Sequence, residues 1–283
     1  MSFEVTADAY GRLMGRYSEP LAIAFADAAG IGAGQRALDV GCGPGALTAE
    51  LVRRLGGGAV CAVDPSRSFV AAARERLPEV DIRLSGAEQI PFPDGVFDAA
   101  LAQLCVHFMA DPVAGLREMA RVTRPGGMVA ACVWDHAGGR SPVALLWQAA
   151  RELDPSAPDE SDLNGAREGH LASLFTSAGL AGAQATTLTV RARHASFEEW
   201  WEPFTLGVGP AGAYVQSLAA CPRNRLRDRL RELAGEQPGE ISATAWTVTC
   251  RTLPAGHALP PIVQLLQPGR LAAASSTSGC SRR

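Results

Sequence analysis

The sequence contains no lysine: all 26 of its basic residues, in a chain of 283, are arginine. A chain without lysine cannot form a Schiff base with a carbonyl substrate, and it lacks the lysine that holds phosphates in a P-loop. Enzyme classes that depend on either chemistry are therefore excluded.

Paired cysteines, an excess of charge and long apolar runs are also missing. The seven cysteines are odd in number and form no C-x-x-C pair, so they indicate neither a disulfide framework nor a zinc site. A net charge of −3 gives no electrostatic reason to expect a nucleic acid or an anionic membrane as partner. No stretch reaches the roughly 18 apolar residues of a membrane span, and residues 1–10 lack a signal-peptide core. We therefore expect a cytoplasmic protein.

Apolar patterning divides the chain into three parts. Residues 1–35 predict an N-terminal helical cap, which Pro20 would kink or split. Residues 36–252 alternate short apolar runs with amphipathic stretches, which predicts βαβ units, a parallel sheet and right-handed crossovers. A helical insert is expected at about 196–239. Residues 253–283 carry prolines and a Ser/Thr cluster, and predict an unstructured tail. Strands are predicted at 37–40, 59–63, 81–84, 97–102, 127–134, 183–194 and 241–251.

A glycine-rich loop follows the first predicted strand. In LDVGCGPG, Asp39 precedes Gly41, Gly43 and Gly45, and a helix is predicted to begin directly afterwards. Glycines at a strand–helix turn let a ligand lie against the backbone. Because Gly41, Gly43 and Ala46 also fit the dinucleotide fingerprint, the loop alone indicates either NAD or S-adenosylmethionine.

Asp64 is the second feature, at the end of the next predicted strand. A carboxylate at this place can accept hydrogen bonds from both hydroxyls of a ribose. The alternative is a helix N-cap, since Pro65 and Ser66 follow. Both adenosine cofactors would use such a carboxylate, so Asp64 does not choose between them.

Further motifs separate the two cofactors. LDVGCGPG, CAVDPS, AEQIPFPDGVFD and LCVHFMADPVAGLREMARVTRPGG occur in this order, ahead of the two late strands. Together they resemble the class I S-adenosylmethionine-dependent methyltransferases, and most closely the small-molecule (type 11) subgroup that includes the quinone C-methyltransferases. The resemblance runs from about residue 36 to residue 251. It implies an α/β, Rossmann-like fold whose mostly parallel seven-stranded sheet has the order 3-2-1-4-5-7-6, with strand 7 antiparallel and helices on both faces. It also implies S-adenosyl-L-methionine as the cofactor.

The resemblance assigns cofactor-binding residues by position. They are Arg16, Tyr17, Asp39, Gly41, Cys42, Gly43, Gly45, Asp64, Pro65, Ala87, Glu88, Gln103 and Leu104. Arg16 could equally be a surface charge on an amphipathic helix. One position departs from the family pattern, because Gly86 stands where an acidic residue often reaches the adenine. The adenine contact would then depend on backbone groups or on Glu88.

The sequence gives weaker evidence for the residues that bind the methyl acceptor. His107 and His136 are the candidate catalytic bases, although His107 could simply satisfy a backbone group near a strand end. The predicted substrate-binding residues are Trp134, Trp200, Trp201 and Phe204, the last three being either lid or ordinary core. Since adjacent helical residues point about 100° apart, we expect one tryptophan of the pair at 200 and 201 to face the acceptor. No metal ion is expected.

The sequence thus predicts methyl transfer to a small apolar or aromatic acceptor, on carbon or oxygen, by a monomer or homodimer. No N/D-P-P-Y/F element follows the fourth strand, which argues against a nucleic-acid acceptor. The alternatives are an NAD(P)-dependent oxidoreductase and a non-catalytic binding module with a methyltransferase fold. A melting-temperature shift with S-adenosylhomocysteine or with NADH separates the three.

Overall fold

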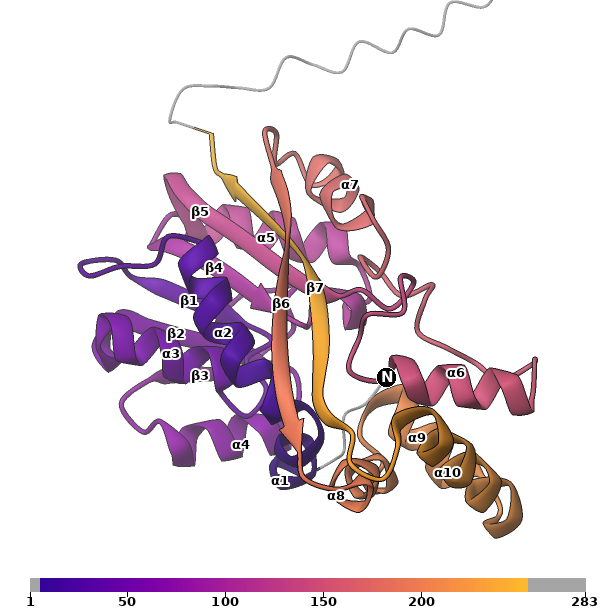
Figure 1. Cartoon of the computed structure of the whole chain (residues 1–283). Helices are drawn as coiled ribbons and strands as arrows, with labels where there is room; N and C mark the ends of the chain where they lie inside the picture. Colours follow the sequence, from indigo (N-terminus) through magenta and orange to yellow (C-terminus); the bar gives the residue numbers. More distant parts are fainter. Residues whose placement is uncertain (1–5, 254–283) are drawn as a thin grey trace, which may run out of the picture.

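The computed structural model describes residues 6–253 (Figure 1). The tail predicted at 253–283 lies, except for its first residue, outside the described residues. In residues 6–253 no helix is both long and apolar enough to cross a bilayer.

Seven strands form one sheet in the order β3-β2-β1-β4-β5-β7-β6. The strands are β1 Ala37–Val40, β2 Val60–Asp64, β3 Asp81–Leu84, β4 Phe97–Gln103, β5 Thr123–Trp134, β6 Gln184–His194 and β7 Gly239–Arg251. Strand β7 runs antiparallel to both β5 and β6, and the pairs among β1 to β5 are parallel. The predicted fold class, strand order and antiparallel strand are confirmed.

Helices follow the strands as the amphipathic stretches predict. Their bounds are α1 Ala7–Tyr10, α2 Arg16–Ala28, α3 Ala46–Leu55, α4 Arg67–Arg76, α5 Pro112–Val122, α6 Ala144–Leu153, α7 His170–Ser177, α8 Phe197–Trp201, α9 Gly209–Ser217 and α10 Ala220–Ala234. Short helical turns lie at η1 Gly11–Gly15, η2 Gly57–Ala59, η3 Val106–Phe108 and η4 Glu202–Leu206. Helix α5 shows why its boundary was predictable: the Asp111 carboxylate accepts a hydrogen bond from the Ala114 N–H at 2.9 Å, and a proline takes the first helical position.

Two hydrophobic layers enclose the sheet. Side chains of α2, α3 and α4, such as Phe25 and Leu51, cover one face, and side chains of α5 and α7, such as Met119 and Phe175, cover the other. The central strands are buried on both sides, which explains why their sequences are nearly continuous apolar runs. Complete burial of one such large side chain stabilises the fold by about 1.5–3 kcal/mol.

The N-terminal helix breaks one turn earlier than expected. Pro20 lies inside α2, and the irregular turn is the π-helical η1 that precedes it. The proline ring excludes a bond to the carbonyl of Arg16. The helix continues through Pro20, so the chain is not split there, and a kink at this residue stays a prediction.

The predicted insert forms α8, η4, α9 and α10 between β6 and β7. Figure 1 shows α6, α9 and α10 gathered at one end of the sheet, with α8 near the end of β6. Their apolar side chains form a third cluster, which includes Ala9 and Leu13 from the N-terminal helices. The insert is therefore packed on the body of the protein.

Candidate active site

A cavity of about 750 Å³ lies beyond the carboxyl ends of β1, β2 and β4. The order of the sheet reverses between β1 and β4, and open α/β sheets bind ligands at such a switch point. Its size suits a small-molecule ligand. The predicted cofactor residues that line it are Asp39, Gly41, Cys42, Gly43, Asp64, Pro65, Ala87, Glu88, Gln103 and Leu104.

Two glycines of the loop after β1 serve different purposes. Gly41 has a φ of 73°, and a Cβ added there would lie 2.5 Å from the Cβ of Cys105, so packing requires glycine. Gly43 has a φ of 54°, and a Cβ added there would meet nothing within 4 Å. A side chain at Gly43 would therefore enter the cavity that this residue lines. Gly45 caps α3 and lies outside the lining.

Asp64 joins the loops after β1 and β2. Its Oδ2 accepts a hydrogen bond from the Gly43 N–H at 2.8 Å, and its Oδ1 accepts one from the Ser66 N–H at 2.8 Å. Burial raises the pKa of Asp64, while the two backbone bonds lower it. Each oxygen can accept a further bond from a ligand. The N-cap of α4 is Ser66 and not Asp64.

Two buried acceptors on the cavity wall lack partners. Asp39 Oδ2 accepts a hydrogen bond from the Thr48 hydroxyl at 2.6 Å, but its Oδ1 accepts none. Gln103 Nε2 donates to the Ser18 carbonyl at 3.0 Å, and its Oε1 is likewise unpaired. Burial raises the pKa of Asp39 to about 7. Because buried polar atoms are normally paired, this wall fits a ligand that brings a donor or a positive charge.

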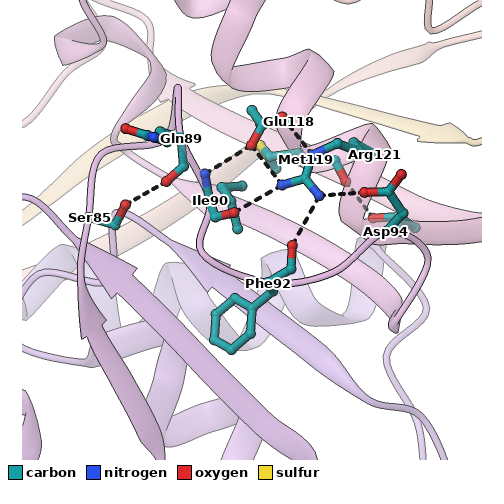
Figure 2. A network of polar contacts seen from close by, with 9 residues as sticks. Ser85, Gln89, Ile90, Phe92, Asp94, Glu118, Met119 and Arg121 are labelled. Carbon is teal, nitrogen blue, oxygen red and sulfur yellow. Dashed lines mark hydrogen bonds and ion pairs between the residues drawn. The ribbon is translucent and has the colours of Figure 1, made fainter.

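The loop that carries Ala87 and Glu88 is held by one arginine of α5 (Figure 2). Arg121 donates to the carbonyls of Ile90 and Phe92 and to the carboxylates of Asp94 and Glu118. The Glu118 carboxylate also accepts from the Ile90 N–H at 2.9 Å. Most of the hydrogen bonds that the Arg121 guanidinium donates go to this loop, and they hold the wall of the cavity in place.

Glu88 also accepts two hydrogen bonds from the backbone. Its Oε1 accepts hydrogen bonds from the N–H groups of Ala110 and Asp111, at 2.9 and 3.3 Å. The carboxylate therefore ties the loop to the start of α5 while Glu88 lines the cavity. Its contact with an adenine stays a prediction.

The N-terminal helices contribute Tyr10 to the site, which sequence reasoning missed. Tyr10 lines the cavity, and burial raises the pKa of its phenol. Arg16 and Tyr17 lie outside the lining. The Tyr17 hydroxyl is 2.9 Å from His194 Nε2, and Arg16 forms an ion pair of 2.5 Å with Glu199. Both side chains hold α2 against β6 and α8, which supports a structural role for them.

The sequence signal for Tyr10 is the apolar stripe of the N-terminal helices. Tyr10, Leu13, Met14 and Tyr17 recur at helical spacing and share one face. Periodicity places both tyrosines inward, but only tertiary packing decides which of them reaches the cavity.

A second cavity, of about 40 Å³, adjoins the first. Tyr10, Leu104 and Phe108 line both of them. His107 and His136 meet in the smaller cavity, with ring centroids 6.0 Å apart. Burial lowers the pKa of both imidazoles, that of His136 to about 4. Both rings are therefore neutral at pH 7, and the burial that lowers their pKa also makes them weaker bases than a free imidazole.

Two further side chains, those of Trp134 and Glu160, line the small cavity, and only the first was predicted from the sequence. Trp134 lines it as expected, with its indole N–H donating to the Met14 sulfur at 3.3 Å. Glu160 also lines it, although its polar sequence neighbourhood is typical of a surface loop. No sequence signal marks Glu160, because its burial arises only from packing of the 154–165 segment.

Leu104 has an unusual backbone. Its φ is 57°, which makes it the one non-glycine residue of positive φ within the described part of the chain. Its N–H donates to the Cys132 carbonyl at 2.9 Å, which holds this conformation at the end of β4. Leu104 lies between the two cavities, and such strain is typical of functional sites.

The tryptophans of the insert lie in the core. Trp200 and Trp201 are 3% and 6% exposed, and both pack on Phe204. None of the three lines either cavity. The short α8 is covered by α10, β6 and η4, so two adjacent side chains are both enclosed. This placement favours the core alternative, and their substrate-binding role stays an untested prediction.

Within residues 6–253, no cluster of three or more His, Cys, Asp or Glu side chains is arranged to hold a metal ion. The arrangement as a whole can bind a ligand bearing hydroxyls and a cation in the large cavity. It can also present neutral imidazoles to a second molecule next to it.

Known proteins share both the sequence and the fold of this region. A family model described as a methyltransferase domain matches residues 38–131. A demethylmenaquinone methyltransferase from Mycolicibacterium paratuberculosis is 44% identical over 107 residues, which are 37% of this chain and 44% of that protein. An uncharacterised methyltransferase from Schizosaccharomyces pombe is 36% identical over 105 residues, 33% of this chain and 38% of the other. The chain thus spans less than half the length of these relatives.

Solved structures extend the likeness across the sheet. The YcgJ protein from Bacillus subtilis has a TM-score of 0.52 at 20% identity, with 84% of this chain and 98% of the other covered. The (4+2)-cyclase SpnF has a TM-score of 0.51 at 21% identity, with coverage of 83% and 81%. At such identities the likeness concerns the fold alone.

Proposed function

Because the chain carries a methyltransferase domain of the class I, S-adenosylmethionine-dependent family, we propose that it transfers the methyl group of this cofactor to a small-molecule acceptor. The acceptor is apolar or aromatic, and methylation is on oxygen or carbon. The observation that carries the proposal is the wall of the large cavity beyond β1, β2 and β4. The unpaired buried oxygens of Asp39 and Gln103 lie on this wall together with the carboxylate of Asp64, at the end of β2.

The residues present fit the cofactor. Asp39 Oδ1 and Gln103 Oε1 are buried acceptors without partners, which suits the ammonium group of the methionine part. Asp64 keeps acceptor capacity for the two ribose hydroxyls. The backbone around Gly43 leaves room for a ligand, and the loop at Ala87 provides a fixed wall for the adenine.

The cofactor supplies an electrophilic methyl group on a sulfonium when bound. The chain must hold the acceptor in line with that methyl and exclude water. Tyr10, Leu104 and Phe108 border both cavities and would position the acceptor. His107 and His136 are the candidate bases for the proton that the acceptor loses. Both are neutral at pH 7, and because burial lowers their pKa, a nearby negative charge is needed to stabilise the protonated ring.

The test compares two ligands that share an adenosine. S-adenosylhomocysteine is expected to raise the melting temperature and to bind in calorimetry, whereas NADH is expected to do neither. A shift with NADH alone would support an oxidoreductase. A shift with neither would support a non-catalytic module with the same fold. With labelled cofactor, a panel of small-molecule acceptors then identifies the substrate.

A further inference from the structure

The small cavity has a polar end formed by His107, His136 and Glu160. The side chains of His136 and Glu160 are 5% and 6% exposed. Neither ring nitrogen of His136 has a hydrogen-bond partner, and neither does Nδ1 of His107. Buried polar atoms in native proteins are normally paired, so three unpaired nitrogens beside one cavity indicate that a ligand completes them.

Glu160 is placed to act on His136. Its Oε2 lies 3.9 Å from His136 Nδ1 and accepts a hydrogen bond from the Trp147 indole N–H at 2.7 Å. Trp147 therefore holds the carboxylate beside the imidazole. At 3.9 Å the carboxylate is too far from the ring for a hydrogen bond, but its negative charge stabilises the protonated imidazole.

The charges around this pair come from several elements. Burial and the charge of Asp159 together raise the pKa of Glu160 to about 7, although the hydrogen bond from Trp147 lowers it. Burial lowers the pKa of His136, while Asp135 and Asp159 raise it. His107 faces His136 from η3, and Tyr10 faces the cavity from α1. Above pH 7 the pair consists of a carboxylate and a neutral imidazole, which is the state that accepts a proton.

The size of the cavity limits what can enter it. A volume of 40 Å³ admits a few water-sized groups but no ring, since one water needs about 10–15 Å³ in this measure. A hydroxyl fits into the small cavity, which His136 lines, whereas the ring that carries it must stay beside Leu104 and Phe108, which also line the large cavity.

We propose that the acceptor is an apolar ring compound with an ionisable hydroxyl, a phenol, and that Glu160 is the positioning residue for its base, His136. The proposal rests on the methyl transfer proposed above. The hydroxyl oxygen bonds to the methyl carbon while the sulfonium–carbon bond breaks and leaves its electron pair on sulfur. The hydroxyl proton passes to a ring nitrogen of His136, and the Glu160 carboxylate balances the imidazolium.

The first experiment tests the pair in the free protein by NMR titration of the histidine rings. The His136 signals are expected to show a titration step near pH 7 that comes from Glu160. Glu160→Gln is expected to abolish this step. Glu152→Gln is the matched control, because Glu152 is a partly exposed carboxylate paired with Arg229 at the end of α6. His136 signals that titrate alike in wild type and Glu160→Gln would overturn the proposal.

The second experiment tests the acceptor class with two probes, 2-naphthol and 2-methoxynaphthalene. At pH 8 Glu160 is ionised, whereas a phenol keeps its proton. Calorimetry on protein saturated with S-adenosylhomocysteine is expected to show a preference for 2-naphthol of about 2- to 12-fold, as for a hydrogen bond to a neutral imidazole. Glu160→Gln is expected to lose that preference and to keep its affinity for S-adenosylhomocysteine. Trp147→Phe, which removes the indole N–H together with one ring of a buried side chain, is expected to reduce it.

The outcomes separate the two proposals. Failure of wild type to bind S-adenosylhomocysteine overturns the proposed function and the acceptor class with it. Normal binding of S-adenosylhomocysteine, together with equal affinity for the two probes, with no binding of either, or with an unchanged preference in Glu160→Gln, overturns the phenol proposal alone.

Discussion

Replacing Asp39 by asparagine tests the cofactor wall most directly. The amide oxygen can still accept the Thr48 hydroxyl, so the local packing is kept. The atom that changes is the unpaired Oδ1, which becomes an NH₂ group that only donates. A ligand ammonium then loses a charged acceptor, which is worth about 1.5–3 kcal/mol. The Kd for S-adenosylhomocysteine is expected to rise by about 10- to 150-fold.

The same substitution is expected to raise stability, with a defined pH dependence. The pKa of Asp39 is about 7 in the folded protein against a usual 3.8. Between these values the folded state holds a proton that the unfolded state has released, so wild-type stability falls as pH rises from about 4 to 7. Asparagine does not titrate. Its stability relative to wild type should therefore increase by about 4 kcal/mol over this range, at about 1.4 kcal/mol per pH unit.

Two measurements check this reasoning. Urea unfolding at pH 4.5 and 7.5 gives the stability difference, and calorimetry from pH 5.5 to 7.5 gives the affinity. A positively charged ligand favours ionised Asp39, so wild-type affinity should increase with pH, and that of Asp39→Asn should not. Asp111→Asn, which keeps a good N-cap on α5, should change neither quantity. Wild-type affinity in Asp39→Asn, or a stability difference that is independent of pH, would refute the placement.

Three further substitutions test other parts of the site. Asp64→Ala is expected to weaken cofactor binding by about 1.5–3 kcal/mol and also to lower the melting temperature, because two backbone N–H groups lose their acceptor; unchanged affinity in calorimetry would contradict it. Gly43→Val should abolish S-adenosylhomocysteine binding. Gly139→Val should keep it, because this control also places valine at a glycine of positive φ with no neighbour within 4 Å, but outside the cavity lining. Trp200→Ala and Trp201→Ala should each lower the free energy of unfolding by about 3–5 kcal/mol with cofactor affinity intact. Lost acceptor affinity at normal stability would restore the lid hypothesis.

The sequence specified the sheet and the large cavity well because their signals are local. The glycine loop lies between an apolar run and an amphipathic stretch. Such a turn places Asp39 and Gly43 at the end of β1 independently of the packing of distant segments. Asp64 follows in the same way from the end of β2. Each of these positions is fixed by one strand and the turn that follows it.

The acceptor side was harder to predict because it is assembled from segments far apart in the chain. Glu160 comes from a polar stretch and becomes buried only through the packing of Trp147 and His136. Trp200 and Trp201 point in different directions from α8, yet α10 and β6 enclose both. The sequence pattern of α8 does not indicate which elements pack against it. Such packing is a property of the tertiary structure.

Leu104 shows how the cost of one backbone conformation can be offset by the burial of the side chain that it carries. Its left-handed backbone costs about 1–2 kcal/mol, which glycine would avoid. The leucine side chain is 7% exposed and packs in the core, and its burial stabilises the fold by about 1.5–3 kcal/mol. A laboratory library screened only for heat resistance should therefore keep leucine at this position, and a thermostable scaffold obtained in this way would retain the side chain between the two cavities.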